Sequence, residues 1–233
     1  MTEPLKKGDL FHIVSASSPI RKKEDLHAGI KVLQEWGLIC NHIDEEDRSW
    51  GYLAGSDEVR FNELHPKKLF PLITFARGGW GSARLLEKKQ LWKEGWMIGF
   101  SDLTSILLAR LAAGFHGGVH GPLLTTLGAE PDWSKDRLKS ILFGNSVPDI
   151  YGDPWGGGTS KGHLIVGNLT VLTHLIGTRY LPNFKKSILI IEDVGEAPYR
   201  IDRMLTHLRL TGILKQLSGL GFGSFTNCDN DIN

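Results

Sequence analysis

Short apolar runs alternate with amphipathic segments along the first half of the chain, and each run has the length of a buried strand. These runs are residues 11–16, 38–43, 72–76 and 96–100. Between the first two, residues 23–36 place Leu26, Ile30 and Leu33 at roughly helical spacing, and Gly37 supplies a natural helix stop. Further helices are predicted to begin near Ala83 and at residue 101. Strands separated by helices predict an α/β fold with a doubly wound, mostly parallel sheet.

The pattern changes after about residue 128. Residues 8–128 are assigned to an N-terminal α/β domain, residues 129–162 to a linker, and residues 163–233 to a smaller C-terminal α/β domain. The linker contains a stretch rich in Gly, Pro, Asp and Ser, which is typical of a crossing loop. The second domain is predicted to hold a strand over 188–191 and a helix over 198–210, with Pro198 at its first turn and Gly212 after its end.

Composition narrows the functional classes. The 233 residues carry 27 Lys+Arg against 26 Asp+Glu, a net charge of +1, which excludes a strongly basic nucleic-acid binder. No apolar run approaches the ~20 residues of a membrane span, and no signal-peptide core follows the polar start. Two cysteines cannot form a disulfide framework. A cytoplasmic protein with no membrane or nucleic-acid partner is expected.

A glycine-rich loop, residues 77–82 (RGGWGS), follows the third predicted strand. Backbone N–H groups in such a loop can cradle an anion or an oxyanion, although a tight turn between strand and helix explains the same glycines. A dinucleotide fingerprint fails because Arg84 stands where its third Gly or Ala belongs.

Ser101 directly follows an apolar strand and precedes a helix, so its hydroxyl is expected at the carboxyl edge of the sheet, where ligands bind in open α/β folds. This is similar to a nucleophile elbow without the second glycine, and an ordinary N-cap serine is the alternative. Glu192 closes the apolar run at 187–191 and can orient a histidine as a triad acid does. Its alternative is a structural ion pair with Arg200 or Arg203.

Metal chemistry has little support in the sequence. His116 and His120 are four residues apart, but the two glycines between them make a shared helix face improbable, and no HExxH motif is present. No metal or organic cofactor is predicted.

Four segments, in this order, resemble one known family. They are residues 76–86 (ARGGWGSARLL), 98–104 (IGFSDLT), 167–170 (GNLT) and 191–205 (IEDVGEAPYRIDRML). Together they are similar to the LD-carboxypeptidases, or muramoyltetrapeptide carboxypeptidases, of serine peptidase family S66, over about residues 10–227.

The resemblance implies a Ser–Glu–His peptidase that removes the terminal D-alanine from murein tetrapeptide during peptidoglycan recycling in the cytoplasm. It assigns the nucleophile to Ser101, the triad acid to Glu192, and the oxyanion hole to backbone N–H groups of Gly78, Gly79 and Asp102. Family members often form homodimers. A sister branch cleaves microcin C-type peptidyl-nucleotide antibiotics instead.

The histidine of the family triad lies well after the glutamate, whereas no histidine follows His207 in this sequence. The C-terminal domain is therefore expected to be incomplete relative to the family. This leaves a catalytically dead remnant or binding module as the alternative to an active peptidase. His116, His120 and His207 are not expected to replace the missing base.

Overall fold

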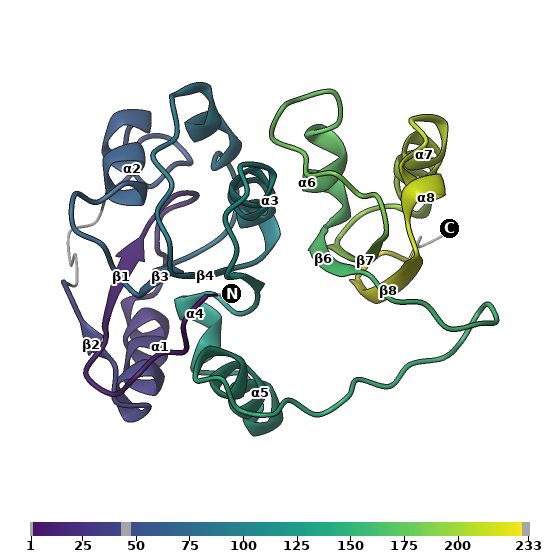
Figure 1. Ribbon diagram of the computed structural model, residues 1–233. Helices are drawn as coiled ribbons and strands as arrows, with labels where there is room; N and C mark the ends of the chain where they lie inside the picture. Colours follow the sequence, from purple (N-terminus) through teal and green to yellow (C-terminus); the bar gives the residue numbers. More distant parts are fainter. Residues whose placement is uncertain (1, 43–47, 230–233) are drawn as a thin grey trace.

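A computed structural model describes residues 2–42 and 48–229, and within them two parallel β-sheets lie side by side, each with helices packed on it (Figure 1). The first sheet has the strand order β2-β1-β3-β4-β5. Its strands are β1 (Leu10–Val14), β2 (Ile39–Cys40), β3 (Leu72–Phe75), β4 (Trp96–Gly99) and β5 (Gly118–His120). All its neighbouring strands pair in parallel. This confirms the α/β fold with a doubly wound parallel sheet.

Helices cover both faces of the first sheet (Figure 1). One face carries α1 (Lys23–Glu35), α4 (Leu124–Leu127) and α5 (Asp132–Leu142), and the other carries α2 (Asp57–Leu64) and α3 (Thr104–Ala112). Two 3-10 helices follow strands of this sheet: η1 (Ala83–Glu87) and η2 (Ser101–Leu103).

Several elements differ from the sequence prediction. The helix predicted near Ala83 is only the 3-10 helix η1, and the strand predicted over 38–43 is the two-residue β2, with residue 43 outside the described part. The residues assigned to a linker from 129 onward include α5. This helix buries Leu138 and Leu142 in the first core, so that residues 129–131 and 143–162 of the predicted linker contain neither helix nor strand.

The second sheet contains β6 (His163–Asn168), β7 (Ser187–Val194) and β8 (Gly219–Thr226), in that order and all parallel. Its helices are α6 (Leu169–His174), α7 (Pro198–Leu210) and α8 (Ile213–Gln216). The bounds predicted for α7 are confirmed. Gly212 follows it with a φ of 76°, a left-handed conformation that glycine adopts without steric cost.

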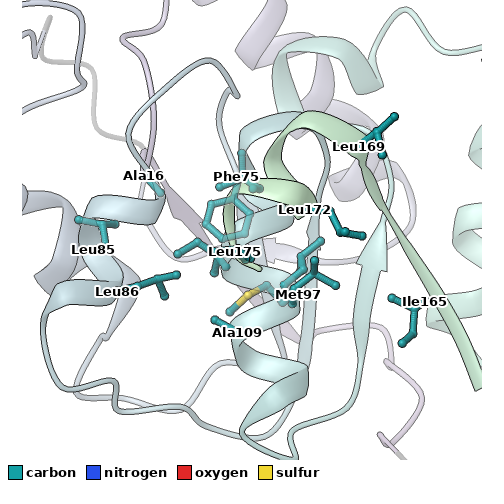
Figure 2. Packing of buried hydrophobic residues seen from close by; sticks show 14 of the residues in the cluster. Ala16, Phe75, Leu85, Leu86, Met97, Ala109, Ile165, Leu169, Leu172 and Leu175 are labelled. Atoms are coloured by element: carbon teal, nitrogen blue, oxygen red, sulfur yellow. The ribbon is translucent and has the colours of Figure 1, made fainter. Parts of the chain in front are cut away.

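The two sheets share one hydrophobic core. Leu169, Leu172 and Leu175 from α6 and the turn after it belong to the same buried cluster as Phe75 and Met97 of the first sheet (Figure 2). Next to this cluster, the Asn168 backbone N–H donates to Thr104 Oγ1 at 3.0 Å. The packing therefore places the carboxyl end of β6 beside the turn that follows β4.

Candidate active site

Ser101 occupies a sharp turn between β4 and η2. Its φ is 60°, a left-handed conformation that costs a non-glycine residue about 1 kcal/mol or more. A Cβ built on Gly78 would lie 3.5 Å from Ser101 Oγ, so the hydroxyl lies against the glycine loop. The predicted position of Ser101 is thereby confirmed, while its catalytic role stays a prediction. The N-cap alternative is wrong, because Phe100 occupies the cap position of η2 and no described backbone N–H donates a hydrogen bond to Ser101 Oγ.

The glycine loop requires its glycines at two positions. Gly79 has a φ of 117°, and a Cβ there would lie 2.2 Å from Ser18 Oγ. Gly81 has a φ of 99°, and a Cβ there would lie 2.3 Å from a methyl carbon of Leu53. Close packing against Ser18, after β1, and against Leu53, before α2, therefore explains the glycine content, beyond the needs of a turn.

Three backbone N–H groups lie near Ser101. The N–H groups of Gly78, Gly79 and Asp102 donate to no other described residue, Asp102 directly follows Ser101 in the chain, and Ser101 Oγ lies against Gly78. Unused N–H groups beside a strained serine are the arrangement that stabilises a developing oxyanion.

Glu192 lies near the carboxyl end of β7, in register with Asn168 on β6. Its Oε1 is 3.3 Å from His120 Nε2, at the end of β5, and the two side chains are 19% and 10% exposed. The alternative ion pair with Arg200 or Arg203 is wrong. Arg200 pairs with Glu196 at 3.4 Å, and the Arg203 guanidinium lies over the Tyr199 ring.

Asp193, next to Glu192, is occupied by structural hydrogen bonds. Its carboxylate accepts from Asn168 Nδ2 at 3.0 Å, from the Thr170 N–H at 2.9 Å and from Thr170 Oγ1 at 2.7 Å. These bonds fix the start of α6, and the side chain is buried. Glu192 is therefore the acid that remains available at this edge.

The two arginines near the glycine loop differ in the hydrogen bonds that their guanidinium groups donate. Arg84 forms a bidentate pair with Asp57, with its shortest contact at 2.6 Å. Arg77 donates through Nη1 to the Pro19 carbonyl at 2.6 Å, and burial together with the nearby Arg21 charge lowers its pKa.

The sequence did not predict that His120 would contact Glu192. Its strand, β5, is three residues long and follows two glycines, so periodicity carried no signal for it. Within the described residues, no group of three or more His, Cys, Asp or Glu side chains could hold a metal ion. Among those same residues, every helix is too short or too polar to cross a lipid bilayer.

Comparison with known proteins agrees with this arrangement. The N-terminal domain of the LD-carboxypeptidases, peptidase family S66, matches residues 11–121, and the C-terminal domain matches residues 161–233. A putative carboxypeptidase of Synechocystis is 43% identical over 97% of this chain and 77% of its own length. The murein tetrapeptide carboxypeptidase of Pseudomonas aeruginosa is 33% identical over 87% of this chain and 72% of its own length.

A solved structure shows the same fold. MccF in complex with glutamyl sulfamoyl guanosine superposes with a TM-score of 0.86 at 21% identity, covering all of this chain and 82% of that one. The likeness defines an α/β protein with a parallel sheet in each of its two halves. The chain belongs to the LD-carboxypeptidase family S66. It spans about three quarters of the length of the two carboxypeptidase relatives.

Proposed function

We propose that this protein is a serine peptidase that removes the terminal D-alanine from murein tetrapeptide, at the L,D bond to meso-diaminopimelate, in cytoplasmic peptidoglycan recycling. The observation that supports it best is the strained Ser101 beside the unused N–H groups of Gly78, Gly79 and Asp102. Family membership and the murein-peptide relatives support the substrate class.

The proposed reaction begins when Ser101 Oγ attacks the carbonyl carbon that precedes D-alanine. The carbonyl oxygen becomes an oxyanion held by the N–H groups of the Gly78–Gly79 turn and of Asp102, fixed donors of a kind worth about 10²–10³ in rate. Collapse of the tetrahedral intermediate breaks the C–N bond, and the protonated amine leaves as D-alanine. Water then hydrolyses the acyl–Ser101 ester by the same steps.

Proton transfer requires a base near Ser101. In the proposed mechanism a histidine held by Glu192 takes the serine proton and gives it to the leaving amine, and the carboxylate stabilises the imidazolium. In the family that this chain resembles, the triad histidine lies well after the glutamate, and no histidine follows His207 in the given sequence. His120, which reaches Glu192 from the other sheet, is assigned the role of orienting the carboxylate.

The proposal is tested by measuring D-alanine release from murein tetrapeptide. Two proteins are compared: the 233-residue chain and the same chain extended with the C-terminal segment of the Synechocystis relative. We expect turnover from the extended chain and little from the short one. Full turnover by the short chain would make a histidine within it, His120 first, the base.

The same assay separates the alternatives. Tetrapeptide binding by the extended chain without release would indicate a binding module. Cleavage of an aminoacyl sulfamoyl nucleotide, but not of tetrapeptide, would favour the specificity of the antibiotic-cleaving branch.

A further inference from the structure

The Asp102 side chain is buried, and one of its oxygens serves two segments of the chain. Oδ2 accepts from Ser17 Oγ at 2.5 Å and from the Ser82 N–H at 2.9 Å. In return, Ser82 Oγ donates to the Asp102 backbone carbonyl at 2.7 Å. Asp102 is therefore bonded through both its carboxylate and its main chain to residues 85 and 20 positions away.

These bonds tie together the loops that follow β1, β3 and β4. The loop after β1 also holds the glycine loop directly, because the Ser18 N–H donates to the Gly78 carbonyl and the Trp80 N–H donates to Ser18 Oγ, both at 3.3 Å. Since a Cβ on Gly79 would lie 2.2 Å from Ser18 Oγ, little space separates the two loops. A shift of either loop moves the N–H groups of Gly78 and Gly79.

A buried cation holds the same two loops through their carbonyls. Arg60 Nη1 donates to the carbonyl of Gly81 at 2.9 Å and to that of Ala16, and its Nη2 pairs with Asp57. The Asp102 carboxylate accepts from donors of the loops after β1 and β3, and the Arg60 guanidinium donates to carbonyls of the same two loops. Each loop is therefore held both at a hydrogen-bond donor and at a hydrogen-bond acceptor.

A buried carboxylate that holds two loops carries a large desolvation cost. Burial raises the pKa of Asp102, and only the hydrogen bonds from Ser17 and Ser82, with the more distant Arg60 charge, oppose that shift. A neutral acceptor could make the same two bonds at a lower desolvation cost. Strong, charge-assisted bonds restrict loop motion more tightly than neutral ones do.

We propose that the Asp102 carboxylate is a positioning residue that sets the geometry of the oxyanion donors, through Ser82 on the glycine loop and through its own backbone N–H. The use of these donors on an acyl oxyanion rests on the function proposed above, whereas the fixing of the loops does not. If Asp102 served stability alone, its substitution would lower the free energy of unfolding and leave kcat unchanged in the folded variant.

The test compares Asp102→Ala, which removes the acceptor, with Asp102→Asn, whose amide oxygen can still accept both bonds. Asp132→Asn is the matched control, because it makes the same charge change at an exposed site on α5. Ser17→Ala removes one bond and provides a milder variant if Asp102→Ala does not fold. Hydrogen exchange at residues 78–82 and kcat and KM for D-alanine release, measured in the extended chain, are the two readouts.

We expect Asp102→Ala to speed exchange of the Ser82 amide at least about tenfold and to lower kcat about 10²-fold, with KM changed less than about threefold. Asp102→Asn should recover kcat to within about tenfold of the parent, and Ser17→Ala should fall between the parent and Asp102→Ala. Parental kcat, or parental protection of Ser82, in folded Asp102→Ala would overturn the inference. If the parent releases no D-alanine, the proposed function fails, and the exchange rates alone then decide whether Asp102 fixes the loop.

Discussion

His120 Nε2 lies 3.3 Å from Glu192 Oε1, and this contact joins the last strand of the first sheet to the central strand of the second. His120 is in register with Gly99, two residues before Ser101, and its ring packs against Phe100 with a centroid distance of 6.2 Å. The proposed triad acid therefore belongs to one sheet and its observed partner to the other. Any relative motion of the two sheets would change the position of Glu192 with respect to Ser101.

The contact predicts energetic coupling between these two residues. In a double-mutant cycle of His120→Phe and Glu192→Gln, we expect the free energies of unfolding to be non-additive by about 1 kcal/mol, because each single change leaves a mostly buried polar group without its partner. Urea unfolding at neutral pH measures the cycle. A control cycle of Glu192→Gln with Asp132→Asn should be additive. Additivity in both cycles would mean that the contact contributes nothing.

Adjacent acids on β7 should behave differently when each is made neutral. Asp193→Asn is expected to lower stability, because a carboxylate that accepts four hydrogen bonds is replaced by an amide with one accepting oxygen. Glu192→Gln is expected to lower stability by no more than about 1 kcal/mol, through its contact with His120, and to reduce D-alanine release strongly, since an amide cannot stabilise an imidazolium. Melting temperature and turnover of both variants decide this. Loss of turnover in folded Asp193→Asn, with Glu192→Gln active, would reverse the assignment.

The backbone of Ser101 can be tested without any substrate. Glycine adopts a φ near 60° without steric cost, whereas alanine does not. Ser101→Gly should therefore be more stable than Ser101→Ala by about 1 kcal/mol. Denaturant unfolding of the two variants measures the difference, and the same pair of changes at half-buried Ser134, inside α5, should favour alanine instead. Equal stability of the two Ser101 variants would show that the turn is not strained.

Acid stability depends on Asp57, which binds Arg84 and Arg60. The hydrogen bond from Arg84, aided by Arg60, lowers the pKa of Asp57 below its usual 3.8, so the charged form is favoured in the folded state. Its contribution is present above that value and is lost as the pH falls through the lowered folded pKa. Asp57→Asn should therefore be less stable than the parent at pH 7, and the gap should close towards pH 3. A gap that is constant with pH would exclude this ion pair as its cause.

Local pattern predicted the parts of the site that lie next to regular elements. The apolar strand before Ser101 and the helix after it predicted the position of the serine. The apolar stripe on α7 predicted the bounds of that helix without error. His120 could not be found this way, because its strand is short and its partner lies 72 residues further along the chain. The bonds of Asp102 to Ser17 and Ser82 are likewise long-range and leave no periodic trace. Helix α5 was missed because most of its residues are polar or charged and only Leu138 and Leu142 are buried.

Ser101→Ala in the extended chain tests the central claim most directly, with D-alanine release from murein tetrapeptide as the readout and Ser146→Ala, at an exposed serine in the loop after α5, as the matched control. The account predicts that Ser101→Ala lowers kcat by at least about 10³-fold while tetrapeptide still binds, and that the control matches the parent. Release of D-alanine by Ser101→Ala at the rate of the parent would contradict it.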